Sequence, residues 1–285
     1  MILNLLCDHM VLSINSRLKM NDGNSIPMLG YGTWQIPDGK KVEECVFTAL
    51  MCGYRLIDTA SIYDNEKGVG NAVRSAMKKG IPRKDIFVTT KLWNDDHNRV
   101  EAAFNESLER LGLDYIDLYL IHWPVIGKRI NTWKIFERLL NTGKVKSIGV
   151  SNFTIAQLKE LMMQTKIVPA VNQVEFSPWL YQRELLDFCN KNNIILEAYS
   201  PLTRGRMLSD PMLREIAEKY KKSPAQIVIR WCLQHNLVLL PKSTEPVKIK
   251  ENSEVFDFEI TEEDMNVIDS WNKNLRFCWN PEELD

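Results

Sequence analysis

The sequence has no excess of charge of either sign. Its 36 Lys and Arg residues are balanced by 37 Asp and Glu, which gives a formal net charge of -1. Proteins that bind nucleic acid or anionic membranes usually have a strong basic excess or a basic patch. The composition therefore gives no reason to expect a nucleic-acid or membrane partner, and any anion that binds must be held by a local cluster of positive groups.

Long apolar runs and paired cysteines are also missing. No run approaches the roughly 18 apolar residues of a membrane-spanning helix. The six cysteines form neither a C-x-x-C pair nor a Cys/His set with zinc spacing, so no metal site is expected. Cysteines of this kind fit a reducing compartment, and we expect a cytoplasmic protein. The first dozen residues have no basic segment and no cleavage site, so we expect residues 1–12 to be a disordered extension.

Low-complexity segments, linkers and breaks in composition are absent from the 285 residues, which favours a single domain over residues 13–285. Short apolar runs rich in β-branched residues alternate with amphipathic ones. Such nearly continuous runs are typical of parallel strands buried on both faces. They predict strands over residues 28–34, 54–60, 86–93, 116–123, 145–152, 170–176, 194–202 and 238–243.

Helical periodicity falls between these runs. It predicts helices over residues 40–53, 99–112, 131–143, 154–164, 181–193 and 223–236, the last with Ser223 as N-cap and Pro224 at the first helical position. Eight strands that alternate with helical patterns indicate an α/β fold of the closed (β/α)₈ TIM barrel type. Residues 12–20 and 25–29, around the turn Asn21-Asp22-Gly23, predict a β-hairpin that precedes the barrel and plugs its bottom.

A dinucleotide-binding fingerprint is not complete anywhere. Gly30-Tyr31-Gly32 has Gln35 where the third glycine would stand, and the pair Gly68 and Gly70 lies inside a helical pattern. A cofactor site of the Rossmann type is therefore not predicted.

Four titratable residues come at or just after predicted strand ends, where barrels of this type place their active sites. Asp58 and Tyr63 follow the second strand, Lys91 ends the third and His122 ends the fourth. Singly, each could be a cap, a rim residue or a core group. Together they form an acid–base set, because a neighbouring ammonium lowers the pKa of a tyrosine and a carboxylate keeps that ammonium charged. A histidine can then orient a substrate oxygen.

The chain resembles the aldo-keto reductase superfamily in seven ordered segments. They read DTASIYDNE, VTTKLW, LYLIHWP, KSIGVSNF, VNQVEFSP, AYSPL and LLPKS, and the resemblance runs from about Ser13 to the end. It implies a catalytic tetrad of Asp58, Tyr63, Lys91 and His122. In such an enzyme Tyr63 protonates a carbonyl oxygen while NADPH delivers hydride to the carbon.

The resemblance also implies the residues that hold the cofactor. Tyr199 would stack on the nicotinamide, Ser151, Asn152 and Gln173 would hold its carboxamide, and Ser200 and Leu202 would lie against the pyrophosphate. Lys242 and Ser243 would bind the phosphate on the adenosine ribose. The full set of expected cofactor contacts is Thr33, Asp58, Ser151, Asn152, Gln173, Tyr199, Ser200, Leu202, Lys242, Ser243, Thr244, Lys248, Glu251 and Asn252.

Two positions depart from the family pattern. Lys248 stands where most NADPH-preferring relatives have arginine, so the charge is kept but the planar fork is lost. NADPH remains the expected cofactor, with NADH as a weaker alternative. Thr203-Arg204 stands where the family often has glycine, which puts the wrapping of the pyrophosphate in doubt and offers Arg204 as an added charge.

The expected substrate pocket is aromatic. Trp34, Trp93 and Trp123 each end a predicted strand, beside Tyr63 and His122, and Trp279 in the tail could close over them. Only residues 124–131 separate the fourth strand from the next helical pattern. In this the chain resembles the short-loop group of diketogluconate reductases and trypanosomatid prostaglandin F synthases, which implies an open pocket for a small-molecule carbonyl substrate. The resemblance favours a monomer.

Two other functions stay open from the sequence. The first is a non-catalytic relative that binds the cofactor as a sensor or channel-associated subunit, although the tetrad is intact. The second is a barrel aldolase with Lys91 as a Schiff-base nucleophile. The segments AYSPL and LLPKS weigh against the second, because an aldolase needs no dinucleotide site.

Overall fold

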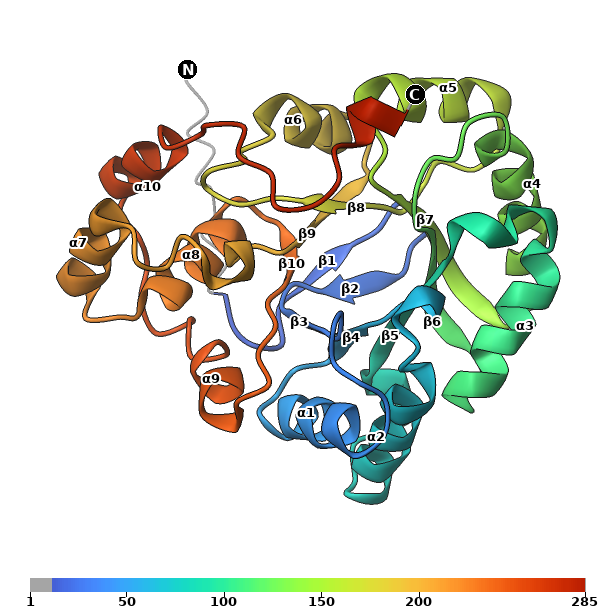
Figure 1. The fold of residues 1–285 in the computed structure, drawn as a ribbon, viewed down its shortest axis with the longest axis horizontal. Coiled ribbons are helices and arrows are strands. Elements are labelled where there is room, and N and C mark those ends of the chain that lie inside the picture. The colour runs from blue at the N-terminus through green and yellow to red at the C-terminus, as the bar shows by residue number, and fades with distance from the viewer. Residues whose placement is uncertain (1–11, 285) are drawn as a thin grey trace, which may run out of the picture.

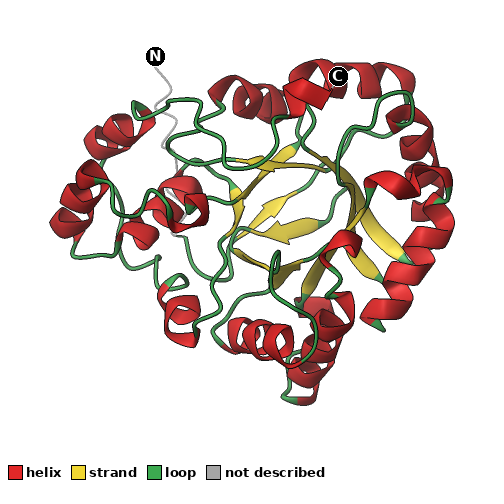
Figure 2. Cartoon of the chain, viewed as in Figure 1, coloured by secondary structure: helices red, strands yellow, loops and turns green. Residues whose placement is uncertain are grey.

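The computed structural model describes residues 12–284, and the expected extension over residues 1–12 lies outside this range except for Leu12. Eight parallel strands form one sheet with the order β10-β9-β8-β7-β6-β5-β4-β3, and the helices surround it (Figures 1 and 2). The strands are β3 (Gly30–Gly32), β4 (Leu56–Asp58), β5 (Phe87–Leu92), β6 (Ile116–Ile121), β7 (Val145–Ser151), β8 (Val171–Glu175), β9 (Ile195–Tyr199) and β10 (Val238–Leu240). Every one lies inside a run predicted from the sequence, so the predicted barrel is confirmed.

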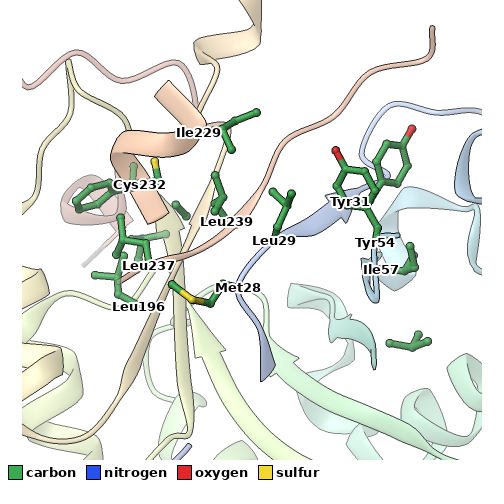
Figure 3. Packing of buried hydrophobic residues seen from close by; sticks show 14 of the residues in the cluster. Met28, Leu29, Tyr31, Tyr54, Ile57, Leu196, Ile229, Cys232, Leu237 and Leu239 are labelled. Atoms are coloured by element: carbon green, nitrogen blue, oxygen red, sulfur yellow. The ribbon is translucent and has the colours of Figure 1, made fainter. Parts of the chain in front are cut away.

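The first and last strands close the barrel. Leu29 and Leu239 form a parallel bridge, and the backbone N–H of Leu239 donates to Met28 O at 2.9 Å. Beyond the bridge, Gly32 N donates to Pro241 O at 3.2 Å. Figure 3 shows Leu29 and Leu239 close to each other at this seam. The seam brings the residues after β3 next to those after β10.

The helices pack their apolar faces against the outside of the barrel. They are α1 (Lys40–Met51), α2 (Glu66–Lys78), α3 (Val100–Leu111), α4 (Arg129–Leu140), α5 (Ile155–Gln164), α6 (Arg183–Lys191), α7 (Pro211–Tyr220), α8 (Pro224–Gln234), α9 (Pro246–Glu251) and α10 (Glu262–Asp269). Ser223 caps α8 in a capping box with Pro224 in the first turn, as predicted, and Thr154 caps α5 in the same way. Within residues 12–284, no helix combines the length and the apolar character needed to cross a membrane.

The hairpin of β1 (Arg17–Lys19) and β2 (Ser25–Pro27) covers the amino ends of the barrel strands. Its Met20 and Ile26 are buried in one cluster with side chains such as Leu56 and Leu118, which come from barrel strands. Asn21 Nδ2 donates to Pro169 O at 2.9 Å, just before β8. The hairpin therefore plugs the bottom, and the opposite, carboxyl end stays open for a site.

Candidate active site

A cavity of about 1250 Å³ occupies the carboxyl end of the barrel. The loops that follow β3, β4, β5, β6 and β9 contribute to its wall, as do the segment after β10 and the C-terminal tail. All four residues of the predicted acid–base set lie together at this end. Asp58, Tyr63 and His122 line the cavity, and Lys91 contacts Asp58 from below.

Lys91 is fully buried and makes three polar contacts. Its Nζ donates to Asp58 Oδ1 at 2.7 Å, to the backbone oxygen of Thr59 at 2.8 Å and to the hydroxyl of Tyr63 at 3.4 Å. The ammonium therefore has one charged partner, and its other two N–H groups donate to the Thr59 backbone oxygen and to the phenol of Tyr63. A buried charge of this kind is tolerated only when it is paired and hydrogen-bonded.

The charges of this group follow from burial and pairing. Burial is the largest single effect and lowers the pKa of Lys91, but the Asp58 carboxylate, with smaller contributions from Tyr63 and Glu197, outweighs it, so the pKa of Lys91 is raised. For Tyr63 the outcome differs from the sequence prediction of a lowered value. Burial raises the pKa of Tyr63 to about 12, because its effect exceeds the opposing effect of the Lys91 ammonium. In this state the phenol is protonated at neutral pH and can act as an acid.

His122 packs edge-on against two rings of the cavity. The centroid of its imidazole ring is 5.7 Å from that of the Tyr63 ring and 5.2 Å from that of the Trp93 ring. Burial, with a further contribution from the Lys91 charge, holds the pKa of His122 well below its ordinary value of 6.5. The imidazole is therefore neutral at pH 7 and can donate one N–H to a substrate oxygen without bringing a second positive charge next to Lys91.

The ends of β7, β8 and β9 form a cluster of amide and hydroxyl groups. Asn152 Nδ2 donates to His122 O at 2.9 Å, and the Tyr199 hydroxyl donates to Asn152 Oδ1 at 2.8 Å. Ser151 Oγ donates to the backbone oxygen of Gln173 at 2.8 Å. Asn152 has a φ of 64°, a conformation that asparagine tolerates better than most residues. These bonds fix the Asn152 amide and the Tyr199 ring at the cavity wall.

Most of the predicted cofactor residues line the same cavity. They are Asp58, Asn152, Gln173, Tyr199, Ser200, Leu202, Lys242, Ser243, Lys248, Glu251 and Asn252. Thr33, Ser151 and Thr244 do not line it. Thr33 is fully buried and donates to Asp58 O at 2.9 Å, Ser151 lies behind Asn152, and Thr244 O accepts from Lys41 Nζ at 3.1 Å.

The cationic part of the cavity follows β10. Lys242 and Ser243 lie directly after the strand, and Lys248 is on α9 with its Nζ 2.9 Å from Glu245 Oε1. Both side chains of this ion pair are exposed, and exposed ion pairs are weak, so the ammonium of Lys248 is available to bind an incoming anion. Because the chain has no overall positive charge, we expected a bound anion to need a local cluster of positive groups, and these two lysines form one.

The segment Thr203-Arg204, which departs from the family pattern, crosses toward the loop after β3. Both residues have positive φ, 51° and 54°, which is unusual for a β-branched residue such as Thr203. The guanidinium of Arg204 lies 4.5 Å from the centroid of the Trp34 ring, and its Nη2 donates to Cys278 Sγ at 3.0 Å. Arg204 thus links three segments of the wall.

The predicted substrate residues Trp34, Tyr63, Trp93, His122 and Trp123 all line the cavity, together with Trp279 from the tail. The ring centroid of Trp279 is 5.6 Å from that of Trp123 and 6.4 Å from that of Trp93. The tail, red in Figure 1, is held by Glu175 at the end of β8. The two carboxylate oxygens of Glu175 accept hydrogen bonds from the backbone N–H groups of Phe277 at 2.7 Å and Cys278 at 3.1 Å.

Some wall residues were not found from the sequence. Arg206, Arg276, Phe277 and Cys278 line the cavity, and the role of Glu175 in holding the tail was not expected. The tail after α10 has no periodicity and no family motif, so the sequence offers no signal for Arg276, Phe277 and Cys278.

The cavity fits a nicotinamide dinucleotide. At one end the amide oxygens of Asn152 and Gln173 offer acceptors to the N–H groups of a planar carboxamide, beside the aromatic ring of Tyr199, while both amide nitrogens donate within the protein. At the other end Lys242, Ser243 and Lys248 offer positive charge and a hydroxyl to a phosphate. The volume of about 1250 Å³ is large for one small ligand and suits a dinucleotide with a second molecule beside it.

Comparison with known proteins gives matches over nearly the whole chain. A sequence model described as the Aldo/keto reductase family matches residues 28–273. Glyoxal reductase of Bacillus subtilis is 47% identical over 277 residues, which are 96% of this chain and 99% of that protein. The 9,11-endoperoxide prostaglandin H2 reductase of Trypanosoma cruzi is 46% identical over 98% of this chain and 97% of its own length. The crystal structure of an aldo/keto reductase from Brucella melitensis superimposes with a TM-score of 0.87 at 46% identity, covering 92% of this chain and 100% of the other.

Proposed function

Because the chain belongs to the aldo/keto reductase family, we propose that it reduces aldehydes and ketones to alcohols with NADPH, and that Tyr63 donates the proton. The observation that supports this most directly is the buried Lys91 ammonium, paired with Asp58 at 2.7 Å and 3.4 Å from the Tyr63 hydroxyl. A protonated phenol next to a fixed positive charge can release its proton to a carbonyl oxygen, since the phenolate that remains is stabilised where it forms.

Each of the four side chains has a separate role in the proposed reaction. His122, held neutral, donates a hydrogen bond to the carbonyl oxygen and directs it at the Tyr63 hydroxyl. Tyr63 transfers its proton as negative charge develops on that oxygen. Lys91 stabilises the phenolate, and Asp58 keeps Lys91 charged and in place. When bound, the reduced nicotinamide supplies the hydride that the carbonyl carbon receives.

The cofactor would be held along the cavity. Asn152 and Gln173 would bind the carboxamide, with Ser151 supporting Asn152 from behind, and Tyr199 would face the ring. Lys242, Ser243 and Lys248 would bind the phosphate that distinguishes NADPH from NADH. Lys248 gives charge without the planar fork of arginine, so we propose a preference for NADPH with slower use of NADH.

The substrates are proposed to be small carbonyl compounds with an apolar part. Four tryptophans line the pocket, and only the short segment from His122 to Lys128 separates the catalytic histidine from α4, so no long loop narrows the pocket. Two of the relatives are named as reductases of glyoxal and of a prostaglandin endoperoxide, ligands of very different size, which agrees with an open pocket.

An aldolase that uses Lys91 as a Schiff-base nucleophile is disfavoured by the same geometry. A nucleophilic lysine needs a neutral amine, whereas Asp58 raises the pKa of Lys91 and keeps it charged. Lys91 is also fully buried beneath Asp58 and Tyr63.

The test is NADPH oxidation with a panel of aldehydes, repeated with NADH and with Tyr63→Phe. We expect turnover by the wild type and a loss of about 100- to 10,000-fold in kcat for Tyr63→Phe, with little change in NADPH affinity. Near-normal activity of Tyr63→Phe would show that another group donates the proton. Binding of NADPH without turnover of any aldehyde would favour a cofactor sensor instead.

A further inference from the structure

Glu197 is a buried carboxyl group that the proposed mechanism does not use. It lies in the middle of β9, paired in register with Gln173 of β8 and Val238 of β10, and it is 0% exposed. Its Oε2 accepts a hydrogen bond from Gln173 Nε2 at 2.9 Å. Its Oε1 is buried and has no hydrogen-bond partner among the residues that the structure describes. An acidic side chain in such a place needs a reason.

Gln173 connects Glu197 to the catalytic group. The same Nε2 that donates to Glu197 also donates to Asp58 Oδ2 at 2.9 Å. An amide nitrogen has two protons, so both are used. The reverse orientation would place the amide oxygen against the Asp58 carboxylate, which pairs with Lys91 and has no proton to donate. Asp58 therefore determines which way the amide of Gln173 faces, and Glu197 accepts the second proton of Nε2.

The remaining polar atom of the Gln173 amide is its oxygen, Oε1. Gln173 lines the cavity, and none of residues 12–284 donates a hydrogen bond to its Oε1 in the structure. Because Nε2 is hydrogen-bonded to the two carboxyl groups, Gln173 presents a hydrogen-bond acceptor to the cavity and no donor. An acceptor at this point suits an N–H of a primary carboxamide.

The charge of Glu197 is set by its surroundings. Burial, followed by the negative charge of Asp58, raises the pKa of Glu197 to about 8, against the smaller effects of Gln173 and Lys91. The charged groups that influence it are Asp58 on β4 and Lys91 on β5, while its register partners are Gln173 on β8 and the apolar Val238 on β10. At pH 7 the side chain is mainly a neutral acid, which accepts from Gln173 without adding a second anion next to the Asp58–Lys91 pair.

We propose that Glu197 is a positioning residue that accepts from Nε2 of Gln173 and so holds the Gln173 amide with its oxygen toward the cavity, to accept an N–H of the cofactor's carboxamide. Glu197 touches neither substrate nor cofactor, and it acts through Gln173. The identity of the cofactor rests on the proposed function, whereas the state of Glu197 and its hold on Gln173 do not.

The first test uses the cofactor-free protein. Infrared difference spectra between pH 6 and pH 10 should show the loss of a protonated carboxyl band with a midpoint near pH 8, and this band should be missing from Glu197→Gln. Absence of the band from the wild type at pH 6 to 7 would mean that Glu197 is already ionised there, which would overturn the proposal of a neutral acid.

The second test measures NADPH affinity by fluorescence quenching. Glu197→Leu removes the acceptor and should weaken binding about tenfold, the effect of one lost hydrogen bond to a buried amide. Glu197→Gln keeps an acceptor and should restore affinity to within about threefold of the wild type. Leu196→Ala is the control, because Leu196 is a buried neighbour on β9 that belongs to the core outside the barrel. It should lower the unfolding temperature without changing affinity.

The outcomes separate the two proposals. Wild-type affinity in Glu197→Leu, or equal weakening in Glu197→Leu and Glu197→Gln, would overturn the positioning role. If the wild type binds NADPH but reduces no aldehyde, the proposed function is wrong. The NADPH affinities of the Glu197 variants would then still test the positioning role. A wild type that binds neither NADPH nor NADH would overturn both.

Discussion

Replacing Lys91 by methionine is expected to destabilise the barrel strongly, because it leaves the Asp58 carboxylate buried without its counterion. The side chains of Lys91 and Asp58 are 0% and 5% exposed, and their charged atoms are 2.7 Å apart. At an effective dielectric constant of about 20 this separation corresponds to a gross attraction of about 6 kcal/mol. Desolvation offsets part of it, so the net cost of removing one partner is about 3–5 kcal/mol.

The loss should depend on pH in a direction that identifies its cause. Burial raises the pKa of Asp58, and Lys91 opposes that rise. Without Lys91 the folded protein holds a proton on Asp58 that the unfolded chain releases above its ordinary pKa of about 4. The stability of Lys91→Met should therefore fall as the pH rises above this value, until it reaches the folded pKa of Asp58.

A double-mutant cycle with urea unfolding measures the interaction. Asp58→Asn combined with Lys91→Met should cost much less than the sum of the single changes, with a coupling energy of about 3 kcal/mol or more. The pair Arg138–Glu101 is the matched control, since its side chains are 62% and 61% exposed and 3.4 Å apart. Its coupling should be below about 1 kcal/mol. Equal coupling in the two pairs would refute the conclusion that burial makes the first pair strong.

Three further changes test other parts of the molecule. Lys242→Ala should weaken NADPH binding about tenfold and NADH binding by less than about twofold, measured by fluorescence quenching, because only NADPH has the phosphate. Burial lowers the pKa of His97 from 6.5 to about 4, so the unfolded chain binds a proton in this interval that the folded protein does not. Stability should fall by about 1 kcal/mol per pH unit as the pH drops from 6.5 to 4, and His97→Gln should reduce this slope in acid unfolding curves. Glu175→Leu releases the backbone of the tail that carries Trp279, so it should raise KM for bulky aromatic aldehydes about tenfold while leaving kcat within about threefold.

Each of these has a result that would contradict it. Equal weakening of NADPH and NADH in Lys242→Ala would place the phosphate elsewhere. An unchanged acid slope in His97→Gln would mean that His97 is not the group that takes up the proton. An unchanged KM in Glu175→Leu, with Trp279→Ala raising it, would mean that the tail stays in place without the carboxylate.

The strands of the barrel could be predicted because burial on both faces leaves a continuous apolar run in the sequence. The helix α8 was readable from its cap, Ser223-Pro224, and α5 from its apolar periodicity. The helix α7 was not predicted, although Asp210 caps it and Pro211 opens it, the same signal as at α8. Its buried residues Leu213, Ile216 and Ala217 also stand at helical spacing, so the signal was present in the sequence and was overlooked.

The location of the candidate site residues was predictable where a family motif meets a strand end, as at Asp58, Lys91 and His122. It was not predictable where contacts depend on which strands are neighbours and in what register. The link from Gln173 to Glu197 requires β8 and β9 to pair at those residues, and nothing local to either residue indicates it. The pKa of Tyr63 was predicted in the wrong direction, because the extent of its burial is a property of the assembled cavity.

The seam between β3 and β10 has a consequence for synthesis on the ribosome. Asp58, Lys91 and His122 emerge early, but the backbone bond from Leu239 to Met28 waits until the last strand has left the exit tunnel. Until then the sheet is open along the edge of β3, exposing unpaired backbone groups that invite intermolecular pairing. Lys242, which we propose to bind the phosphate of NADPH, lies two residues after that last strand, so it leaves the exit tunnel at about the stage at which the ring can close.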